Sequence, residues 1–165
     1  MDLVLDATAG NRHMWGGDKE PDNVIFMDKE KGLFYPPTLF ATWEYLPFRE
    51  DVIKKGIFDP PHIFSETSQF NKNPGARPNG AKKIPGWYGA FSSKRVAIHA
   101  LLKAQKEFAR ICPELFFKWN IASLDIDPVL TLFVDWDVVV MVPFRSRGEK
   151  PSTWWVKMAR KHGGT

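Results

Sequence analysis

Short runs of apolar residues recur along the chain and end in acidic or turn-forming residues. Residues 3–5 and 24–27 form two such runs, which end in Asp6 and Asp28. Both runs are apolar throughout, which is typical of strands buried on both faces of a parallel sheet. Further strands are predicted over 38–43, 56–58 and 115–117, and a terminal hairpin over 138–142 and 153–156, joined through 145–148.

One long segment shows helical spacing. Its apolar positions are Val96, Ala97, Ala100, Leu101, Ala104 and Phe108, and they predict a helix that runs to about Arg110. Ser92 or Ser93 is expected to cap it. Asp127-Pro128 predicts a short second helix, because proline suits the first turn. Strands joined by crossovers and followed by a hairpin predict an α/β doubly wound sheet whose last strand inserts antiparallel.

Composition narrows the class of protein. A chain of 165 residues fits one domain, and 44% hydrophobic residues suffice for a core. The single cysteine, Cys112, excludes an internal disulfide framework and a Cys-rich zinc site, so no metal is expected. No apolar run approaches the roughly 18 residues of a membrane span, and the first residues lack the features of a signal peptide. We therefore expect a cytoplasmic protein that does not enter a membrane.

Basic residues concentrate in the middle of the chain. The net charge is +4, yet residues 71–110 hold nine basic side chains and one acidic side chain. Residues 65–91 are rich in Asn, Gly and Pro, which predicts a mobile basic loop. Such a stretch is either an electrostatic footprint for a polyanion or a solvated helix face with a loop.

Two features near the first strands suit a nucleoside-type cofactor. Small residues follow the first strand in the order Asp6-Ala7-Thr8-Ala9-Gly10-Asn11. They let a ligand approach the backbone closely, and Gly10 tolerates a positive φ. Asp28 ends the second strand, at the distance from this loop where an acid binds ribose hydroxyls. A carboxylate can accept hydrogen bonds from both hydroxyls of a cis-diol.

The most specific motif is Asp59-Pro60-Pro61-His62, which follows a predicted strand. The Asp59 carboxylate and the Pro60 carbonyl can both accept hydrogen bonds from one exocyclic amine, and two prolines fix the backbone that presents them. Acceptors so arranged orient the amine lone pair toward an electrophile and ease proton loss. The His62 ring is expected to lie against the plane of a base.

This order of motifs resembles the class I S-adenosylmethionine-dependent methyltransferases that act on exocyclic amines, whose motif is (Asp/Asn/Ser)-Pro-Pro-aromatic. A closer likeness is to small methyltransferase-like proteins frequent in phage and prophage genomes, and it covers nearly the whole chain. The features that carry it are residues 6–15, Leu46-Pro47-Phe48, residues 58–62, Tyr88-Gly89, Phe117-Lys118-Trp119-Asn120 and Thr153-Trp154-Trp155. The resemblance implies a Rossmann-like methyltransferase fold: one domain over 1–165, with a mostly parallel seven-stranded sheet and a C-terminal antiparallel hairpin.

The resemblance also implies S-adenosyl-L-methionine as cofactor and assigns residues to it. Cofactor contacts would come from Asp6, Ala7, Thr8, Ala9, Gly10, Asn11, Asp28, Lys29, Thr42 and Trp43. The target amine and base would be held by Asp59, Pro60, Pro61 and His62. Further substrate contacts are expected from Lys82, Lys83, Trp87, Tyr88, Lys94, Arg95, Lys118 and Trp119. Of these, Trp119 either walls the pocket or belongs to the core.

We therefore expect methyl transfer to a nucleobase exocyclic amine in DNA or RNA, with adenine N6 first and cytosine N4 or guanine N2 next. Two alternatives stay open. One is methylation of a small molecule or of a protein amide. The other is an inactive, cofactor-binding subunit of a heteromeric methyltransferase. The expected partner is nucleic acid, and a homodimer or a partner subunit that supplies target recognition is compatible with this small chain.

Overall fold

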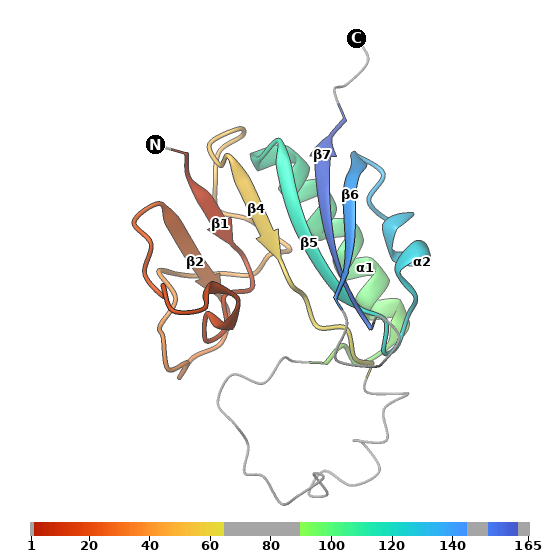
Figure 1. Cartoon of the computed structure of the whole chain (residues 1–165), viewed down its shortest axis with the longest axis horizontal. Coiled ribbons are helices and arrows are strands. Elements are labelled where there is room, and N and C mark those ends of the chain that lie inside the picture. The colour runs from red at the N-terminus through yellow and green to blue at the C-terminus, as the bar shows by residue number, and fades with distance from the viewer. Residues whose placement is uncertain (1, 65–89, 145–151, 162–165) are drawn as a thin grey trace, which may run out of the picture.

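The computed structural model describes residues 2–64, 90–144 and 152–161. Within these ranges, strands form one sheet in the order β3-β2-β1-β4-β5-β7-β6 (Figure 1). The strands are β1 (Val4–Asp6), β2 (Val24–Asp28), β3 (Leu39–Phe40), β4 (Lys55–Phe58), β5 (Glu114–Asn120), β6 (Trp136–Phe144) and β7 (Thr153–Arg160). β1 to β5 run parallel, and β7 lies antiparallel between β5 and β6. This confirms the mostly parallel seven-stranded sheet with its antiparallel C-terminal strands; the turn over 145–148 lies outside the described residues.

Helix α1 (Lys94–Ile111) matches the predicted helix closely. The Ser93 hydroxyl accepts a hydrogen bond from the Val96 backbone N–H, so Ser93 and not Ser92 is the cap. The buried stripe contains Ala97, Ala100, Leu101, Ala104 and Phe108, as predicted. Val96, which was also among the apolar positions with helical spacing, is 46% exposed, because it lies beside this stripe in the first turn.

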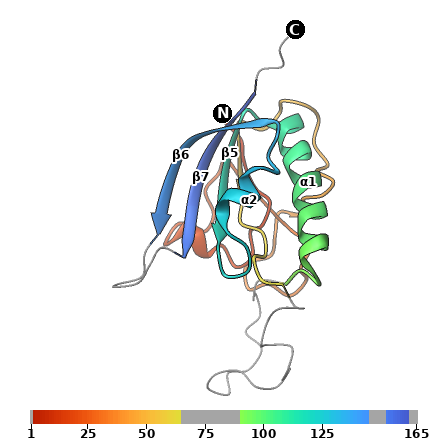
Figure 2. The ribbon, with the colours of Figure 1, turned by 90° about the vertical axis from the view of Figure 1, so that its right-hand side faces the viewer.

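One face of the sheet carries the core. Residues Leu101, Ala104, Phe108 and Ile111 of α1 pack against Leu5, Phe58, Leu115, Phe117 and Met158 of the strands. The short helix α2 (Ile126–Leu130), which begins one residue before the predicted start, covers the same face (Figure 2). Helix α1 comes so close to β4 that a Cβ at Gly56 would lie 2.7 Å from the Phe108 ring. Only glycine fits at that crossing.

The opposite face is covered at β1 and β2 by the 3₁₀ turn η1 (His13–Trp15) and the loop around it. The Trp15 ring packs edge-on against Phe26, with the ring centroids 5.4 Å apart. Over β4, β5, β7 and β6, the described part of the chain places no helix on this face (Figure 2). We call the exposed surface of those strands the open face.

Several strand boundaries differ from the prediction; β6 and β7, for example, are longer than the predicted 138–142 and 153–156. The strand predicted over 38–43 is reduced to β3, because its partner β2 ends at Asp28 and the chain turns at Thr42. β5 extends to Asn120, beyond the predicted 115–117. Its polar residues fit within the strand because they lie on the open face. Neither α1 nor α2 is long and apolar enough to cross a membrane.

Candidate functional site

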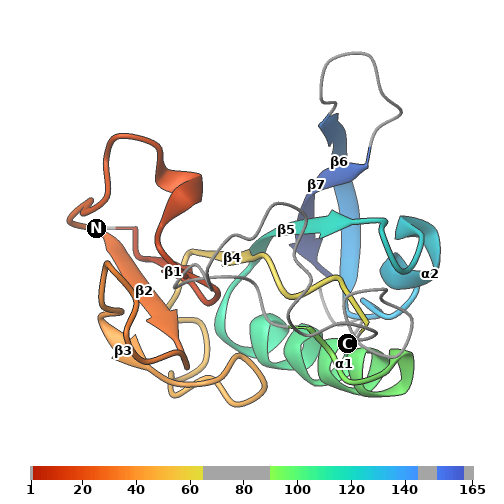
Figure 3. The same cartoon turned by 90° about the horizontal axis from the view of Figure 1, so that it is seen from below.

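The loop that follows β1, residues 7–11, is bonded to both neighbouring strands at the carboxyl edge of the sheet, which Figure 3 shows end-on. The Ala7 N–H donates to the Ile57 carbonyl of β4, and the Ala9 N–H donates to the Met27 carbonyl of β2, both at 3.1 Å. Gly10 adopts a φ of +49°, which favours glycine. The loop is therefore held in place by both neighbouring strands, and its small side chains leave its backbone accessible to a ligand.

Asp28 joins this loop to the end of β2. Its Oδ2 accepts a hydrogen bond from the Gly10 N–H at 2.8 Å, and its Oδ1 accepts one from the Glu30 N–H at 2.9 Å. The carboxylate is half-buried and lines the pocket described below. A carboxylate has lone pairs beyond the two used here, so Asp28 retains capacity to accept from a ligand.

Asp6 lies behind the loop and is fully buried. Its carboxylate accepts hydrogen bonds from the Trp15 indole N–H at 2.8 Å and from the Thr8 N–H at 3.1 Å. Burial raises the pKa of Asp6 to about 6, with a smaller contribution from the negative charges of Asp59 and Asp28, while the two hydrogen bonds oppose the rise. Asp6, which was predicted to contact the cofactor, does not line the pocket described below; its carboxylate holds the loop through Thr8 and Trp15.

The Asp59-Pro60-Pro61-His62 turn follows β4 directly. Asp59 is 2% exposed, and its Oδ2 lies 2.6 Å from the Lys118 ammonium. The Asp59 backbone N–H donates to the Thr8 hydroxyl at 2.7 Å, which joins this turn to the loop after β1. Asp59 and Pro61 line the pocket, whereas Pro60 is buried behind them. Three predicted motifs thus meet at one edge of the sheet.

His62 and Trp119 lie behind the pocket wall. Burial lowers the pKa of His62, and the nearby Lys118 charge lowers it further, against the opposing effect of Asp59. The imidazole is therefore neutral at neutral pH. Trp119 is fully buried, its indole N–H donates to the Leu124 carbonyl at 2.8 Å, and its ring contacts His62 edge-on. Of the two interpretations of Trp119, the core position is the one observed, because alternation along β5 turns its ring toward α1.

These motifs surround one pocket. Its lining is Ala7, Thr8, Ala9, Gly10, Asn11, His13, Met14, Asp28, Lys29, Glu30, Leu33, Trp43, Asp59, Pro61, Ala90 and Phe91. Thr42, which was predicted to contact the cofactor, is exposed and lies outside this lining. Sequence reasoning missed Trp15 and Met14, although both belong to the motif over 6–15, and it missed Phe91, for which the sequence gives no signal.

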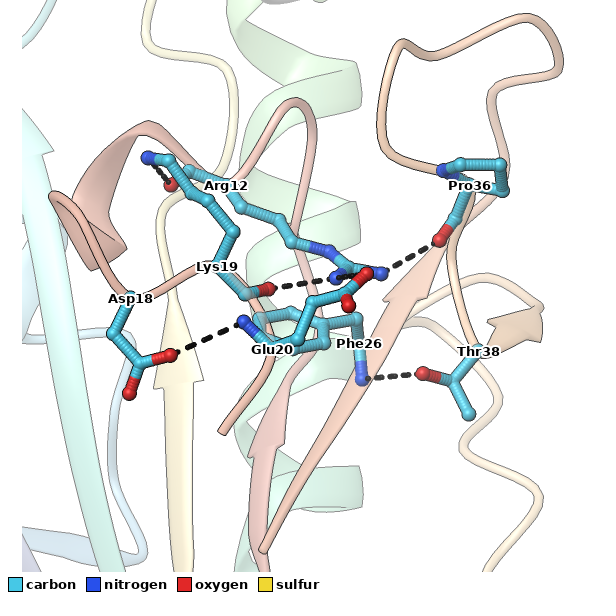
Figure 4. Close-up of polar contacts among 7 residues, drawn as sticks. All are labelled: Arg12, Asp18, Lys19, Glu20, Phe26, Pro36 and Thr38. Carbon is cyan, nitrogen blue, oxygen red and sulfur yellow. Dashed lines mark hydrogen bonds and ion pairs between the residues drawn. The ribbon is translucent and has the colours of Figure 1, made fainter. Parts of the chain in front are cut away.

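Arg12 anchors the loop over β2 (Figure 4). Its guanidinium donates to the carbonyls of Lys19 and Pro36, both at 2.7 Å, and lies 4.0 Å above the centre of the Phe26 ring. The side chain is 6% exposed. Arg12 therefore fastens the segment before β2 to the segment after it, and both segments contribute to the pocket.

Apart from Lys118 and Trp119, the predicted substrate side chains fall into two groups. Lys94 and Arg95 are exposed in the first turn of α1, shortly after Phe91 of the pocket lining. The others on the predicted mobile basic loop over 65–91, namely Lys82, Lys83, Trp87 and Tyr88, lie outside the described residues. Phe64 forms a parallel bridge with Phe91, and the Phe91 N–H donates to the Ile63 carbonyl at 3.0 Å. Both ends of the undescribed segment therefore start at the rim of the pocket.

The site offers little to metal or thiol chemistry. Among the described residues, no three His, Cys, Asp or Glu side chains come together as they would around a metal. Burial raises the pKa of the Cys112 thiol to about 12, so the thiol stays protonated and is a poor nucleophile.

No protein-family model and no curated protein matches this sequence. Solved structures do resemble it. An rRNA methylase from Streptococcus thermophilus is 14% identical, with a TM-score of 0.50 over 98% of this chain and 87% of its own. A candidate RNA methyltransferase from Pyrococcus horikoshii is 14% identical, with a TM-score of 0.48 over 96% of this chain and 74% of its own. A candidate methyltransferase from Streptococcus mutans, solved in complex with SAH, is 12% identical, with a TM-score of 0.45 over 98% of this chain and 87% of its own.

Sequence identities this low show a shared fold, and they do not show a shared activity or substrate. Together with the strand order and the antiparallel β7, the likeness to the Streptococcus thermophilus structure shows that this chain has a Rossmann-like methyltransferase fold. In open α/β sheets, ligands bind outside the carboxyl ends of the strands. The pocket lies at that edge, beside β1, β2 and β4.

Proposed function

We propose that this protein is an S-adenosylmethionine-dependent N-methyltransferase that acts on an exocyclic amine of a nucleobase in DNA or RNA, with adenine N6 as the first target. The observation that carries the proposal is the position of Asp59. Its buried carboxylate, followed by two prolines, lines the same pocket as the small-residue loop 7–11 and Asp28. The fold supports this function, and the rRNA methylase from Streptococcus thermophilus shares that fold.

The pocket lining fits the cofactor. The small residues of loop 7–11 leave backbone accessible for a nucleoside and an amino acid. The Asp28 carboxylate is placed to accept hydrogen bonds from ribose hydroxyls. Trp43 supplies a flat apolar surface for adenine, and Lys29 is a cation on the same wall. S-adenosylmethionine, when bound, supplies a strongly electrophilic methyl group carried on a positively charged sulfur.

The remaining chemistry falls to residues of the Asp59 turn. The Asp59 carboxylate accepts a hydrogen bond from an N–H group of the amine, which directs the nitrogen lone pair toward the methyl carbon. As the nitrogen–carbon bond forms, the carbon–sulfur bond breaks and its electron pair stays on sulfur. The proton that leaves the nitrogen passes to the Asp59 carboxylate and then to water. Lys118 supplies the positive charge that compensates the buried carboxylate.

Methyl transfer from labelled S-adenosylmethionine to adenine-containing DNA, to RNA and to protein tests the proposal. We expect label in nucleic acid. Asp59→Ala is expected to lower the transfer rate by at least about 100-fold, with cofactor affinity within a few-fold of the parent. Asp125→Ala is the matched control, because this exposed carboxylate makes no cap hydrogen bond to α2. Transfer only to protein or to a small molecule would support the alternative substrates, and cofactor binding without any transfer would support an inactive subunit.

The nucleic-acid substrate has a separate test. We propose that Lys82, Lys83, Lys94 and Arg95 contact phosphates, which is supported by the exposed position of Lys94 and Arg95 near the pocket. Changing all four to Ala is expected to flatten the salt dependence of DNA or RNA binding by about 3 units of log–log slope. An unchanged slope and affinity would show that the basic stretch is only solvated surface.

A further inference from the structure

The open face carries an ordered pattern of side chains across three strands. The register of β5, β7 and β6 aligns them in four rows. The rows are Glu114, Ala159 and Asp137; Phe116, Lys157 and Val140; Lys118, Trp155 and Val142; and Asn120, Thr153 and Phe144. Aromatic rings and lysines therefore alternate in adjacent positions, in a pattern unlike the wholly apolar face under α1.

Contacts within this pattern hold the rings beside positive charge. The Lys118 ammonium lies 5.7 Å from the centre of the Trp155 ring, and the Lys157 ammonium lies 5.8 Å from the centre of the Phe116 ring. Lys157 also lies 3.3 Å from the Glu114 carboxylate. Both distances between ammonium and ring are within the range of a cation–π interaction.

The third strand leaves apolar surface exposed to water. Val142 is 52% exposed and Phe144 is 61% exposed. Exposed apolar side chains grouped on one face, and not scattered singly, are typical of a binding surface. On β5, β7 and β6 this face carries two lysines, Lys118 and Lys157, and two acids, Glu114 and Asp137. The alternation of rings with lysines suits a partner that has both flat apolar groups and phosphates.

The open face is continuous with the pocket. Lys118 lies in its third row, and the ammonium of this residue reaches the Asp59 carboxylate, which lines the pocket. Trp155 is the neighbour of Lys118 on β7. A polymer whose reacting unit sits at Asp59 would therefore have its adjacent units beside Trp155.

We propose that the open face is a stacking platform for the single-stranded nucleotides that flank the target base. Bases would stack on Trp155, Phe116 and Phe144, while Lys118 and Lys157 would lie near phosphates. Sheets that present aromatic residues in this way bind single strands because every base has a flat face. The inference rests on the proposed function, since it takes nucleic acid as the substrate.

Charge argues against a second copy of the chain as the occupant. Two open faces stacked on each other would bring Lys118 and Lys157 of both copies together at the centre of the contact. The cores of protein interfaces are depleted of lysine.

Fluorescence anisotropy with labelled single-stranded and duplex oligonucleotides tests the platform. Trp155→Ala and Phe144→Ala are each expected to weaken single-strand binding about 5-fold to 100-fold, and Trp155→Phe is expected to restore most of it. Phe144 is so exposed that its truncation leaves the fold intact. Tyr45→Ala is the matched control, because Tyr45 is an exposed aromatic residue with the Lys103 ammonium 4.8 Å from its ring, on the α1 side. This control is expected to bind as the parent does.

The same proteins are titrated with S-adenosylhomocysteine, which separates this inference from the proposed function. Parent-like oligonucleotide affinity in both Trp155→Ala and Phe144→Ala would overturn the platform, and cofactor binding would leave the methyltransferase function standing. A parent dimer that Trp155→Ala converts to a monomer, at unchanged oligonucleotide affinity, would assign the face to a second copy. Trp155-dependent binding without cofactor binding would support the platform and count against the methyltransferase.

Discussion

Lys118 and Asp59 form an ion pair across neighbouring strands at the wall of the pocket. The Lys118 ammonium lies 2.6 Å from the Asp59 Oδ2. The strand register explains this, because Phe58 pairs with Phe117 and the next residue on each strand is one member of the pair. A buried carboxylate without a compensating charge is costly. The pair therefore places a compensating cation beside the buried Asp59 carboxylate.

Replacing the cation of this pair should impair turnover more than cofactor binding. For Lys118→Met we expect kcat to fall about 10-fold to 100-fold, with cofactor affinity within a few-fold of the parent. Lys118→Arg keeps the charge and should recover part of the rate. Lys103→Met removes an exposed lysine away from the pocket and should behave as the parent. Equal kcat in Lys118→Met and the parent, measured in single-turnover assays, would remove Lys118 from the site.

Asp28 should determine cofactor affinity. Asp28→Ala removes the acceptor for ribose hydroxyls and is expected to cost about 1–3 kcal/mol of binding free energy, measured by isothermal titration with S-adenosylhomocysteine. Asp28→Asn keeps an oxygen for the Gly10 N–H. This variant should unfold at nearly the parent's denaturant concentration and still bind more weakly. Parent-like affinity in the alanine variant would contradict the ribose assignment.

Asp6 should make stability depend on pH in mildly acidic solution. Its pKa rises from 3.8 to about 6 in the folded protein, so the protonated carboxyl is favoured by folding. The stability that this group contributes is fully present below about pH 3.8 and is lost as the pH rises through about 6. The loss is roughly 3 kcal/mol for a shift of this size.

Asp6→Asn does not titrate, so it isolates this effect. The unfolding free energy of the parent relative to Asp6→Asn should decrease between pH 4 and pH 7, as measured by urea denaturation at each pH. A difference that stays constant over this range would show that the Asp6 carboxyl titrates normally.

Arg12 should contribute to stability through its buried hydrogen bonds. Arg12→Met leaves the carbonyls of Lys19 and Pro36 without this donor, which is expected to cost about 2–4 kcal/mol. Glu20→Ala is the matched control: the Glu20 side chain is 79% exposed, so losing this ion pair should cost at most about 0.5 kcal/mol. Similar denaturation midpoints for the two variants would contradict the anchoring role of Arg12.

Local patterns were enough to predict the α/β class of the sheet, its antiparallel C-terminal strand and the main helix. Asp6, Asp28 and Asp59 each stand at or just after the end of one of three neighbouring parallel strands. Parallel strands have their carboxyl ends at the same edge of the sheet, so the three motifs lie close together because of the strand order alone. The sequence could not decide between Ser92 and Ser93 as the cap, because both are serines at the start of the same helix.

Side-chain direction was harder to predict than strand position. Trp119 and Lys118 are consecutive, and alternation along β5 places Trp119 in the core and Lys118 on the open face, where it reaches Asp59. The sequence does not indicate which is which without the register. Asp6 is similar: its motif placed it near a ligand, but its carboxylate turns back to Trp15 because that indole lies above it. Phe91 reaches the pocket through a long-range bridge to Phe64 that no local pattern reveals.

The bridge between Phe64 and Phe91 has an evolutionary consequence. It fixes both ends of the intervening segment against each other at the pocket rim. The entropy of closing a loop grows only slowly with its length, by about 0.6 kcal/mol for each doubling. Changes in the number of residues between these two phenylalanines are therefore expected to disturb the sheet little. Relatives of this chain would then be free to differ between Phe64 and Phe91 while loop 7–11, Asp28 and Asp59 keep their places.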